Sequence, residues 1–164
     1  MNRTIILADD DDSVRSLLAK ALRRARWEVV EFADGTEALN AALAAPPDLV
    51  ILDVSMPGMD GYRVLRTLRG NPQTRGILVF MLTGGLAEES EKLKDPPDGW
   101  IGKPFQIADV VRRIETAMLS RHERADDDRC AVCNAVIAPH AGRFRHDGKD
   151  VCEHCHDAAV GRGL

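Results

Sequence analysis

Short apolar runs alternate with amphipathic stretches along the first 120 residues. Apolar runs bounded by turn residues predict buried strands, and apolar residues three or four positions apart predict helices. The strands are expected at Thr4–Ala8, Glu28–Phe32, Leu49–Asp53, Ile77–Leu82 and Trp100–Ile101. The helices are expected at Ser13–Ala25, Thr36–Ala44, Tyr62–Leu68, Leu86–Lys94 and Ile107–Leu119.

Strands that alternate with helices predict one α/β domain, in which helices cover both faces of a parallel sheet. The expected fold class is therefore a doubly wound five-stranded parallel sheet. A common strand order for such sheets is 2-1-3-4-5, which places the first strand beside the third. The carboxyl ends of the strands then meet at one edge, where ligands bind in proteins of this class.

Polar residues stand at the carboxyl ends of four of these strands. Asp53 ends the third strand, and Asp9 and Asp10 follow the first. Thr83 follows the fourth strand and Lys103 follows the fifth. Three carboxylates at one edge repel one another unless a cation lies among them, and hard carboxylate oxygens suit Mg²⁺.

An acidic run before a helix also has a simpler interpretation. Aspartates in that place cap the first turn and interact favourably with the helix dipole. Asp11 and Asp12 are assigned to this role. Asp9 and Asp10 are assigned to the site, because polar residues recur at the other strand ends.

These residues, in this order, resemble the receiver domain of two-component response regulators, over about residues 3–119. The resemblance implies a flavodoxin-like fold and a phosphoryl group that Asp53 accepts from a sensor histidine kinase or phosphotransfer protein. It also implies a Mg²⁺ site formed by Asp10, Asp53, the backbone carbonyl of Ser55 and, through water, Asp9. Such a protein is a phosphoacceptor in signalling rather than an enzyme, although it can assist its own phosphorylation and dephosphorylation.

The resemblance also implies which residues sense the phosphoryl group. Lys103 would pair with one phosphoryl oxygen, and Thr83 would donate its hydroxyl to another. Trp100 occupies the position of an aromatic residue that turns inward behind the threonine, where the family more often has Tyr or Phe. The alternative is that Trp100 is simply a packed surface aromatic.

The segment between Gly85 and Trp100 departs from the family pattern. Few of its residues are apolar, and Pro96-Pro97 limits the helix that can form before them. We expect this helix to be short and weakly anchored. Family members often dimerise or dock partners through the fourth helix, fifth strand and fifth helix, so this output surface is expected to be atypical.

The chain changes character after Leu119. Residues 120–129 are polar and charged without an apolar period, which is typical of a linker or a frayed helix end. All four cysteines follow, as two C-x2-C pairs. The expected organisation is a receiver domain (1–119), a linker (120–129) and a small C-terminal module (130–164).

The cysteine pairs predict a structural zinc site in that module. Four thiolates would complete a tetrahedral Zn²⁺ shell, and they belong to Cys130, Cys133, Cys152 and Cys155. Disulfide bonds and a redox-active pair are alternatives, although a chain expected in the cytoplasm argues against disulfides. The histidines that could substitute as ligands are His140, His146, His154 and His156. Phe144 and Val151 flank a predicted hairpin turn, and Asp157–Val160 could form a short helix.

Charge limits the partners that the sequence favours. The formal net charge of the chain is −4, and residues 130–164 hold four basic and four acidic side chains. A neutral module lacks the basic surface that nucleic acid requires, so an unknown protein target is favoured. The first twenty residues do not resemble a secretory signal, and no apolar stretch approaches the ~20 residues of a membrane span. These features predict a cytoplasmic protein without a membrane partner.

Two functions of different kinds remain open from the sequence. In the first, which the residues favour, phosphorylation of Asp53 switches the interactions of the receiver and its zinc module. In the second, the receiver fold is a phosphorylation-independent scaffold, and the module is its docking element. A third and weaker alternative is a DNA-binding transcriptional regulator.

Overall fold

The computed structural model describes residues 3–85, 94–127, 144–146 and 149–151, and its N-terminal part has the predicted α/β fold. Five parallel strands form one sheet in the order β2-β1-β3-β4-β5, which confirms the predicted strand order. The strands are β1 (Thr4–Ala8), β2 (Glu28–Phe32), β3 (Leu49–Asp53), β4 (Leu78–Thr83) and β5 (Gly99–Gly102).

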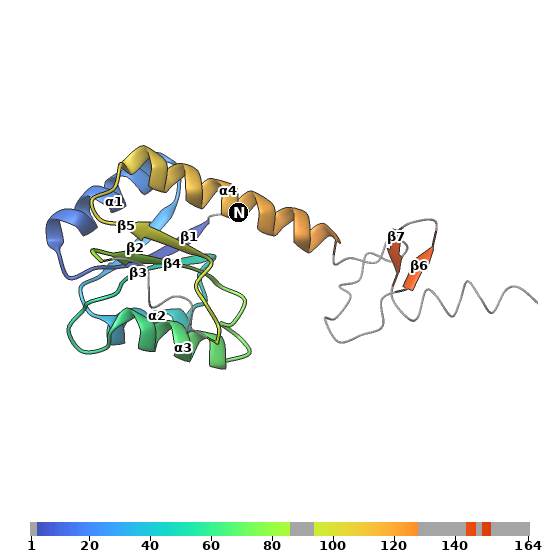
Figure 1. Ribbon diagram of the computed structural model, residues 1–164, viewed down its shortest axis with the longest axis horizontal. Helices are drawn as coiled ribbons and strands as arrows, with labels where there is room; N and C mark the ends of the chain where they lie inside the picture. Colours follow the sequence, from blue (N-terminus) through green and yellow to red (C-terminus); the bar gives the residue numbers. More distant parts are fainter. Residues whose placement is uncertain (1–2, 86–93, 128–143, 147–148, 152–164) are drawn as a thin grey trace, which may run out of the picture. The chain divides into compact units, whose positions relative to one another are not determined.

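Helices cover both faces of this sheet (Figure 1). Helices α2 (Gly35–Ala44) and α3 (Gly61–Gly70) lie on one face, and α1 (Asp12–Arg24) and the start of α4 (Ile107–Asp127) lie on the other. Every residue of β3 is buried as a result. This double cover explains why the central strands read as continuous apolar runs rather than as alternating patterns.

The core on the α2–α3 face joins strand residues to residues of both helices. It includes Ile6, Val50, Leu52, Val79 and Met81 from the sheet and Ala38, Leu39, Val64, Leu65 and Leu68 from the helices. Full burial of a side chain such as Leu or Val stabilises the fold by about 1.5–3 kcal/mol relative to exposure. This packing fixes where the central strands end, and therefore where the polar residues that follow them lie.

Aspartates start three of the helices. Asp11 is the N-cap of α1 and accepts hydrogen bonds from the N–H groups of Ser13 (2.8 Å) and Val14 (3.2 Å). Asp34 caps α2 and Asp60 caps α3 in the same way. The predicted capping role of Asp11 is confirmed, whereas Asp12 is the first helical residue.

The last helix is longer than predicted. We expected it to end at Leu119, with a linker or a frayed helix end over residues 120–129, and α4 continues to Asp127. The positions after Leu119 lack an apolar period, yet Arg, Glu and Ala among them have high helix propensity, and no Gly or Pro interrupts them. The loss of periodicity marks the end of the apolar stripe rather than the end of the helix.

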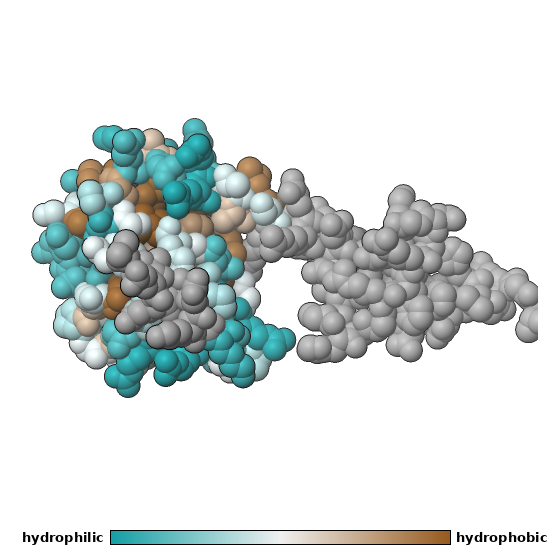
Figure 2. All heavy atoms as spheres, in the orientation of Figure 1, coloured by the Kyte–Doolittle hydropathy of each residue, from teal (hydrophilic) through white to brown (hydrophobic). Residues whose placement is uncertain are grey.

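The surface of the described part is largely hydrophilic in the view of Figure 2, with apolar side chains in small groups. The large apolar side chains exposed in the described residues are Leu17, Val30 and Leu119. None of the described helices has both the length and the hydropathy needed to cross a membrane.

The C-terminal part contains an antiparallel hairpin of β6 (Phe144–His146) and β7 (Lys149–Val151). Phe144 pairs with Val151 across it, which confirms the predicted hairpin. The chain divides into two compact units, Met1–Arg113 and Ile114–Leu164. The predicted helix at Leu86–Lys94, the four cysteines and the predicted helix at Asp157–Val160 lie outside the described residues, apart from Lys94.

Candidate functional site

Three carboxylates meet where β1 and β3 end. The two strands are neighbours, with Ala8 paired to Leu52, so the residues that follow lie side by side. One carboxylate oxygen from each of Asp9, Asp10 and Asp53 lies within 4.8 Å of the others. Asp9 is fully buried and Asp53 is only 6% exposed, whereas Asp10 is exposed. The structure therefore brings together the three acids predicted from the strand ends.

Backbone groups orient the two buried carboxylates. The N–H of Asp11 donates to Oδ1 of Asp9 at 2.9 Å, and the N–H of Ser55 donates to Oδ2 of Asp53 at 2.9 Å. Arg15 of α1 donates from Nη1 to the backbone carbonyl of Asp9 at 2.6 Å and also pairs with Asp12. Each of the two buried acids is thus held by the turn that follows its strand. The sequence alone did not indicate that Arg15 would bond to the backbone of Asp9.

Lys103 bridges the two buried acids. Its Nζ lies 2.8 Å from Oδ2 of Asp9 and 2.7 Å from Oδ1 of Asp53. Lys103 follows β5, which is separated from β3 by β4, so the side chain has to reach across the end of a strand. A long and flexible lysine side chain suits this task.

Burial and pairing act in opposite directions on these groups. Burial raises the pKa of the Asp9 carboxyl above its ordinary value, although hydrogen bonds from Lys103 and the Asp11 N–H oppose the shift. Burial lowers the pKa of the Lys103 ammonium, but its hydrogen bonds to Asp53 and Asp9 outweigh burial and hold that pKa above its usual range. Lys103 therefore remains charged at neutral pH.

An open pocket of about 820 Å³ gives access to this cluster. Its lining includes Asp10, Asp53, Ser55, Thr83 and Lys103, which are five of the residues predicted for the site. Three hard oxygen donors beside an open volume fit Mg²⁺, which keeps several waters when it is bound by protein carboxylates.

Thr83 lines the pocket, but its hydroxyl already has partners. Oγ1 accepts a hydrogen bond from the N–H of Gly85 at 3.1 Å and lies 3.3 Å from the carbonyl of the same residue. To donate to a bound group in the pocket, the hydroxyl would have to give up its bond to the Gly85 carbonyl, whereas it could keep the bond from the Gly85 N–H. Among the described residues, no atom lies within 4 Å of a Cβ placed at Gly84 or Gly85.

Trp100 is half-buried and packs against the core on the α2–α3 face. Its ring centroid lies 6.1 Å from that of Tyr62, with an interplanar angle of 51°. Tyr62 also lines the pocket, so Trp100 is paired with a residue of the pocket wall. Tyr62 was absent from the predicted site, because a tyrosine in the first turn of a helix has no distinctive pattern.

Gly61 allows the loop after Asp53 to fold back onto that residue. A Cβ at Gly61 would lie 2.3 Å from the carbonyl oxygen of Asp53 and 2.9 Å from Cε of Met81. The N–H of Gly61 donates to the carbonyl of Val54 at 3.1 Å. The close approach explains why only glycine fits here, and it fixes the path of the chain through Ser55.

The predicted zinc ligands Cys130, Cys133, Cys152 and Cys155 lie outside the described residues, and the zinc site stays a prediction. Within the described residues, the acidic cluster at Asp9, Asp10 and Asp53 is the group of side chains placed to hold a metal ion.

Comparison with known proteins identifies relatives of this architecture. The family model for the response regulator receiver domain matches residues 5–115 of this chain. The chain is 31% identical over 153 residues to the DNA-binding response regulator MtrA of Mycobacterium tuberculosis, with 92% of this chain and 65% of that protein covered. It is 35% identical over 128 residues to the alkaline phosphatase synthesis transcriptional regulatory protein PhoP of Bacillus subtilis, with 76% of this chain and 52% of that protein covered.

Solved structures show the same fold. The chemotaxis response regulator CheY4 of Vibrio cholerae is similar with a TM-score of 0.65 and 29% identity, over 71% of this chain and 98% of that one. The likeness covers the α/β part and supports the flavodoxin-like fold. The chain spans only about two thirds of the length of MtrA and half that of PhoP.

Proposed function

Since the chain belongs to the response regulator receiver family, we propose that Asp53 accepts a phosphoryl group in a Mg²⁺-dependent transfer. The observation that carries this proposal is the cluster of Asp9, Asp10 and Asp53 with Lys103 bridging the two buried acids. Receiver domains interact with sensor histidine kinases, so a histidine kinase or a phosphotransfer protein is the expected donor. The protein would act as a phosphoacceptor in signalling rather than as an enzyme on a separate substrate.

In this reaction a carboxylate oxygen of Asp53 attacks phosphorus, and the bond from phosphorus to the donor atom breaks. The electron pair of that bond leaves with the donor group, and Asp53 becomes an acyl phosphate. Ser55 N–H and Lys103 Nζ hold the two carboxylate oxygens of Asp53 and so orient the nucleophile. The approach of the oxygen to phosphorus needs little proton transfer, and positioning and electrostatics supply most of the catalysis.

Mg²⁺ would offset the charge of the phosphoryl oxygens. Asp10, Asp53 and the Ser55 carbonyl are the proposed ligands, with Asp9 acting through water. Lys103 supplies a second positive charge that can pair with a phosphoryl oxygen. Thr83 is proposed to give up its bond to the Gly85 carbonyl and to donate to another phosphoryl oxygen. Trp100 and Tyr62 are proposed to follow this movement.

Intact-mass spectrometry tests this proposal directly. The full chain is incubated with Mg²⁺ and acetyl phosphate, and we expect one phosphoryl adduct that is absent in Asp53→Asn and in samples with excess chelator. A wild-type chain without an adduct, or an adduct that persists in Asp53→Asn, would refute it. A signalling output that persists in Asp53→Asn would instead favour the phosphorylation-independent scaffold.

We also propose that Cys130, Cys133, Cys152 and Cys155 hold one structural Zn²⁺. The support is the spacing of the two C-x2-C pairs and the hairpin of β6 and β7 that lies between them in the sequence. Native mass spectrometry should find one zinc per chain, and Cys152→Ser should lose it. His156→Ala is the matched control and should keep the metal if four thiolates complete the shell. Full zinc content in Cys152→Ser would contradict the site.

DNA-binding regulation is the second candidate function. The relatives named MtrA are described as DNA-binding response regulators, which weakens the expectation that nucleic acid is no partner. Against it stands the balance of four basic and four acidic side chains in residues 130–164. Binding of duplex DNA that falls steeply with added salt would support this candidate. No binding near micromolar protein would favour a protein target of the C-terminal module.

A further inference from the structure

Strand β5 is weak, yet it places two residues of the candidate site. It is a four-residue strand at the edge of the sheet, and two of its residues, Gly99 and Gly102, are glycines. Glycine loses much conformational entropy in a strand and offers no side chain for packing. The strand nevertheless contains Trp100 and leads directly to Lys103. Contacts other than its own propensity must therefore set its start and register.

Asp98 fixes the start of β5 at the end of the sheet opposite the acidic cluster. Its N–H donates to the carbonyl of Val79 at 2.8 Å, and its Oδ2 accepts from the N–H of Val79 at 2.8 Å. The same Oδ2 accepts from Nη2 of Arg69 at 2.7 Å. One aspartate thus joins β5 to the start of β4 and to an arginine of α3.

Arg69 is itself held firmly. Its Nη1 donates to the backbone carbonyls of Arg75 (2.9 Å) and Ile77 (2.7 Å), in the connection between α3 and β4. The side chain of Arg69 is only 13% exposed, although that of Asp98 is 36% exposed. A planar guanidinium can serve several acceptors at once in a fixed geometry. The end of α3, the start of β4 and the start of β5 therefore meet at a single side chain.

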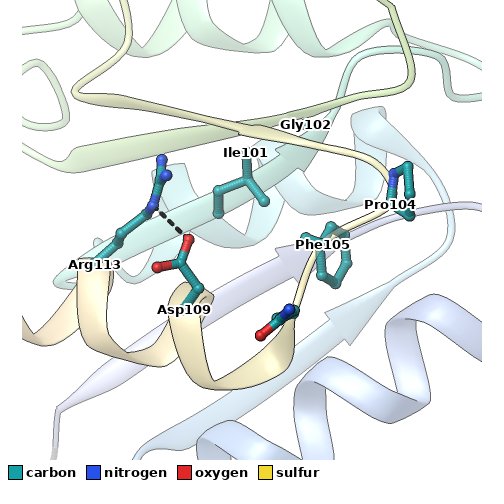
Figure 3. A pocket seen from close by; sticks show the side chains of 7 residues that line it. Ile101, Gly102, Pro104, Phe105, Asp109 and Arg113 are labelled. Atoms are coloured by element: carbon teal, nitrogen blue, oxygen red, sulfur yellow. Dashed lines mark hydrogen bonds and ion pairs between the residues drawn. The ribbon is translucent and has the colours of Figure 1, made fainter.

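Fewer contacts hold the other end of β5. The N–H of Lys103 donates to the carbonyl of Thr83 at 2.6 Å, and Nη1 of Arg113 donates to the carbonyl of Trp100 at 3.2 Å. Figure 3 shows Arg113 on α4, paired with Asp109 and directed toward the strand. A pocket of about 440 Å³, lined in part by Ile101, Gly102 and Arg113, lies beside this end. Side-chain packing therefore supports the second half of β5 only in part.

We infer that Arg69 and Asp98 are positioning residues for the phosphoryl site. By fixing where β5 begins, they set the pairing of Gly102 with Thr83, and through it the distance of Lys103 from Asp9 and Asp53. The inference rests on the proposed function only for its effect on phosphoryl transfer. Its effect on Mg²⁺ affinity rests on the same proposal, whereas its effect on strand β5 stands independently.

The inference predicts effects of opposite sign on two properties. If β5 loosens, Lys103 moves away from the carboxylates, and phosphoryl transfer that needs its charge slows. Asp9 and Asp53 keep their own backbone contacts on β1 and β3 and lose a competing cation. Mg²⁺ affinity should then stay equal or increase. A general loosening of the fold would instead lower both.

Three variants of the full chain test the inference. Arg69→Met removes the bonds from Arg69 to Asp98 and to the carbonyls of Arg75 and Ile77. Asp98→Asn weakens the ion pair but keeps an acceptor for the N–H of Val79. Arg66→Met is the matched control, because Arg66 is exposed on the same helix and its side chain makes no hydrogen bond or ion pair to another described residue. Hydrogen exchange at the Gly99–Gly102 amides, titration with Mg²⁺ alone, and the rate of phosphorylation by acetyl phosphate are measured for each.

In Arg69→Met and Asp98→Asn we expect exchange of the β5 amides to be ~10-fold faster or more. Mg²⁺ should bind equally or more tightly, and phosphorylation should be several-fold slower, while Arg66→Met matches the wild type. Unchanged exchange in β5, or a joint loss of Mg²⁺ affinity and phosphorylation, would overturn the inference. If the wild type takes up no phosphoryl group, the proposed function fails, and the exchange results still decide whether Arg69 fixes the start of β5.

Discussion

Asp9 follows β1 and Asp53 ends β3, whereas Thr83 ends β4 and Lys103 follows the edge strand β5. The two carboxylates and the other two side chains are held by different means. The acids extend from β1 and β3, where most residues are fully buried, and the next turn of backbone donates to each carboxylate. Lys103 depends on a long side chain that follows a glycine-rich edge strand. The Thr83 hydroxyl has only the backbone of Gly85 as a partner among the described residues.

This difference indicates two roles within the site, one in metal binding and one in contact with a phosphoryl group. Carboxylates on rigid strands can present a metal with ligands in constant geometry, which Mg²⁺ requires. A lysine with a long side chain after an edge strand, and a threonine hydroxyl bonded to the turn after β4, can change partners when a phosphoryl group arrives. Four experiments can break or sharpen this comparison.

The largest effect is expected for substitution of Lys103, the cation that bridges Asp9 and Asp53. Lys103→Met should slow phosphorylation of Asp53 by ~10²–10³-fold, because it removes a charged donor from the developing phosphoryl charge. The same variant should bind Mg²⁺ more tightly, since Nζ no longer occupies the carboxylates. Acetyl phosphate kinetics and Mg²⁺ titration measure the two effects. Lys20→Met, at an exposed lysine, is the control. Weaker Mg²⁺ binding by Lys103→Met would contradict the claim that the carboxylates hold the metal without help from Lys103.

The loop that follows Asp53 is tightly packed, so a substitution there should lower the stability of the fold. Gly61→Ala would place a Cβ 2.3 Å from the Asp53 carbonyl oxygen, and we expect it to lower the free energy of unfolding by about 1–3 kcal/mol. Gly70→Ala, at the end of the same helix, has no atom near its Cβ and should be neutral or slightly stabilising. Urea denaturation compares them, and equal effects would remove the claim of close packing at Gly61.

A smaller effect is expected at Thr83, because its role follows phosphorylation. Thr83→Ala should still be phosphorylated, within a few-fold of the wild-type rate, but Trp100 should no longer respond to the adduct. Thr83→Ser keeps the hydroxyl and should keep the response. Fluorotryptophan NMR can follow Trp100 separately from the buried Trp27. A normal Trp100 response in Thr83→Ala would show that the effect of phosphorylation reaches Trp100 without the Thr83 hydroxyl.

The smallest effect is expected at Asp109, which orients Arg113 beside β5. The hydrogen bond from Arg112, with the charges of both arginines, lowers the pKa of Asp109 below its ordinary value of 3.8. Its pairing therefore stabilises the fold above that value, and the contribution is lost as pH falls through the lowered pKa. Thermal unfolding should show Asp109→Asn slightly less stable than the wild type near neutral pH. The difference should shrink in strong acid and in high salt.

Much of the site could be predicted because its position follows from strand ends. Asp9, Asp53 and Lys103 each follow an apolar run, and parallel strands bring such positions to one edge whatever the details of packing. The capping role of Asp11 and the hairpin from Phe144 to Val151 also depend on short-range patterns. The structure brings the predicted receiver residues together, while their chemical roles and the zinc site stay predictions.

The contacts that could not be predicted join residues through packing rather than through pattern. Arg69 and Asp98 are far apart in the sequence and meet only because α3, β4 and β5 are packed together. An arginine in the last turn of a helix normally interacts with the helix carbonyls or with solvent, so Arg69 gave no signal. The end of α4 was missed for a different reason, since charged residues can continue a helix without an apolar stripe.

The bridging position of Lys103 also sets the formal charge of the cluster. Three carboxylates and one ammonium sum to −2 (−3 + 1) when all are ionised. One divalent cation cancels that charge, whereas one monovalent cation leaves half of it. The attraction also weakens with ionic strength, because the screening length is about 10 Å at 0.1 M salt. Occupancy of the site should therefore depend on the salt concentration around the protein as well as on the supply of Mg²⁺, so ionic strength would act on the proposed phosphoryl transfer as well.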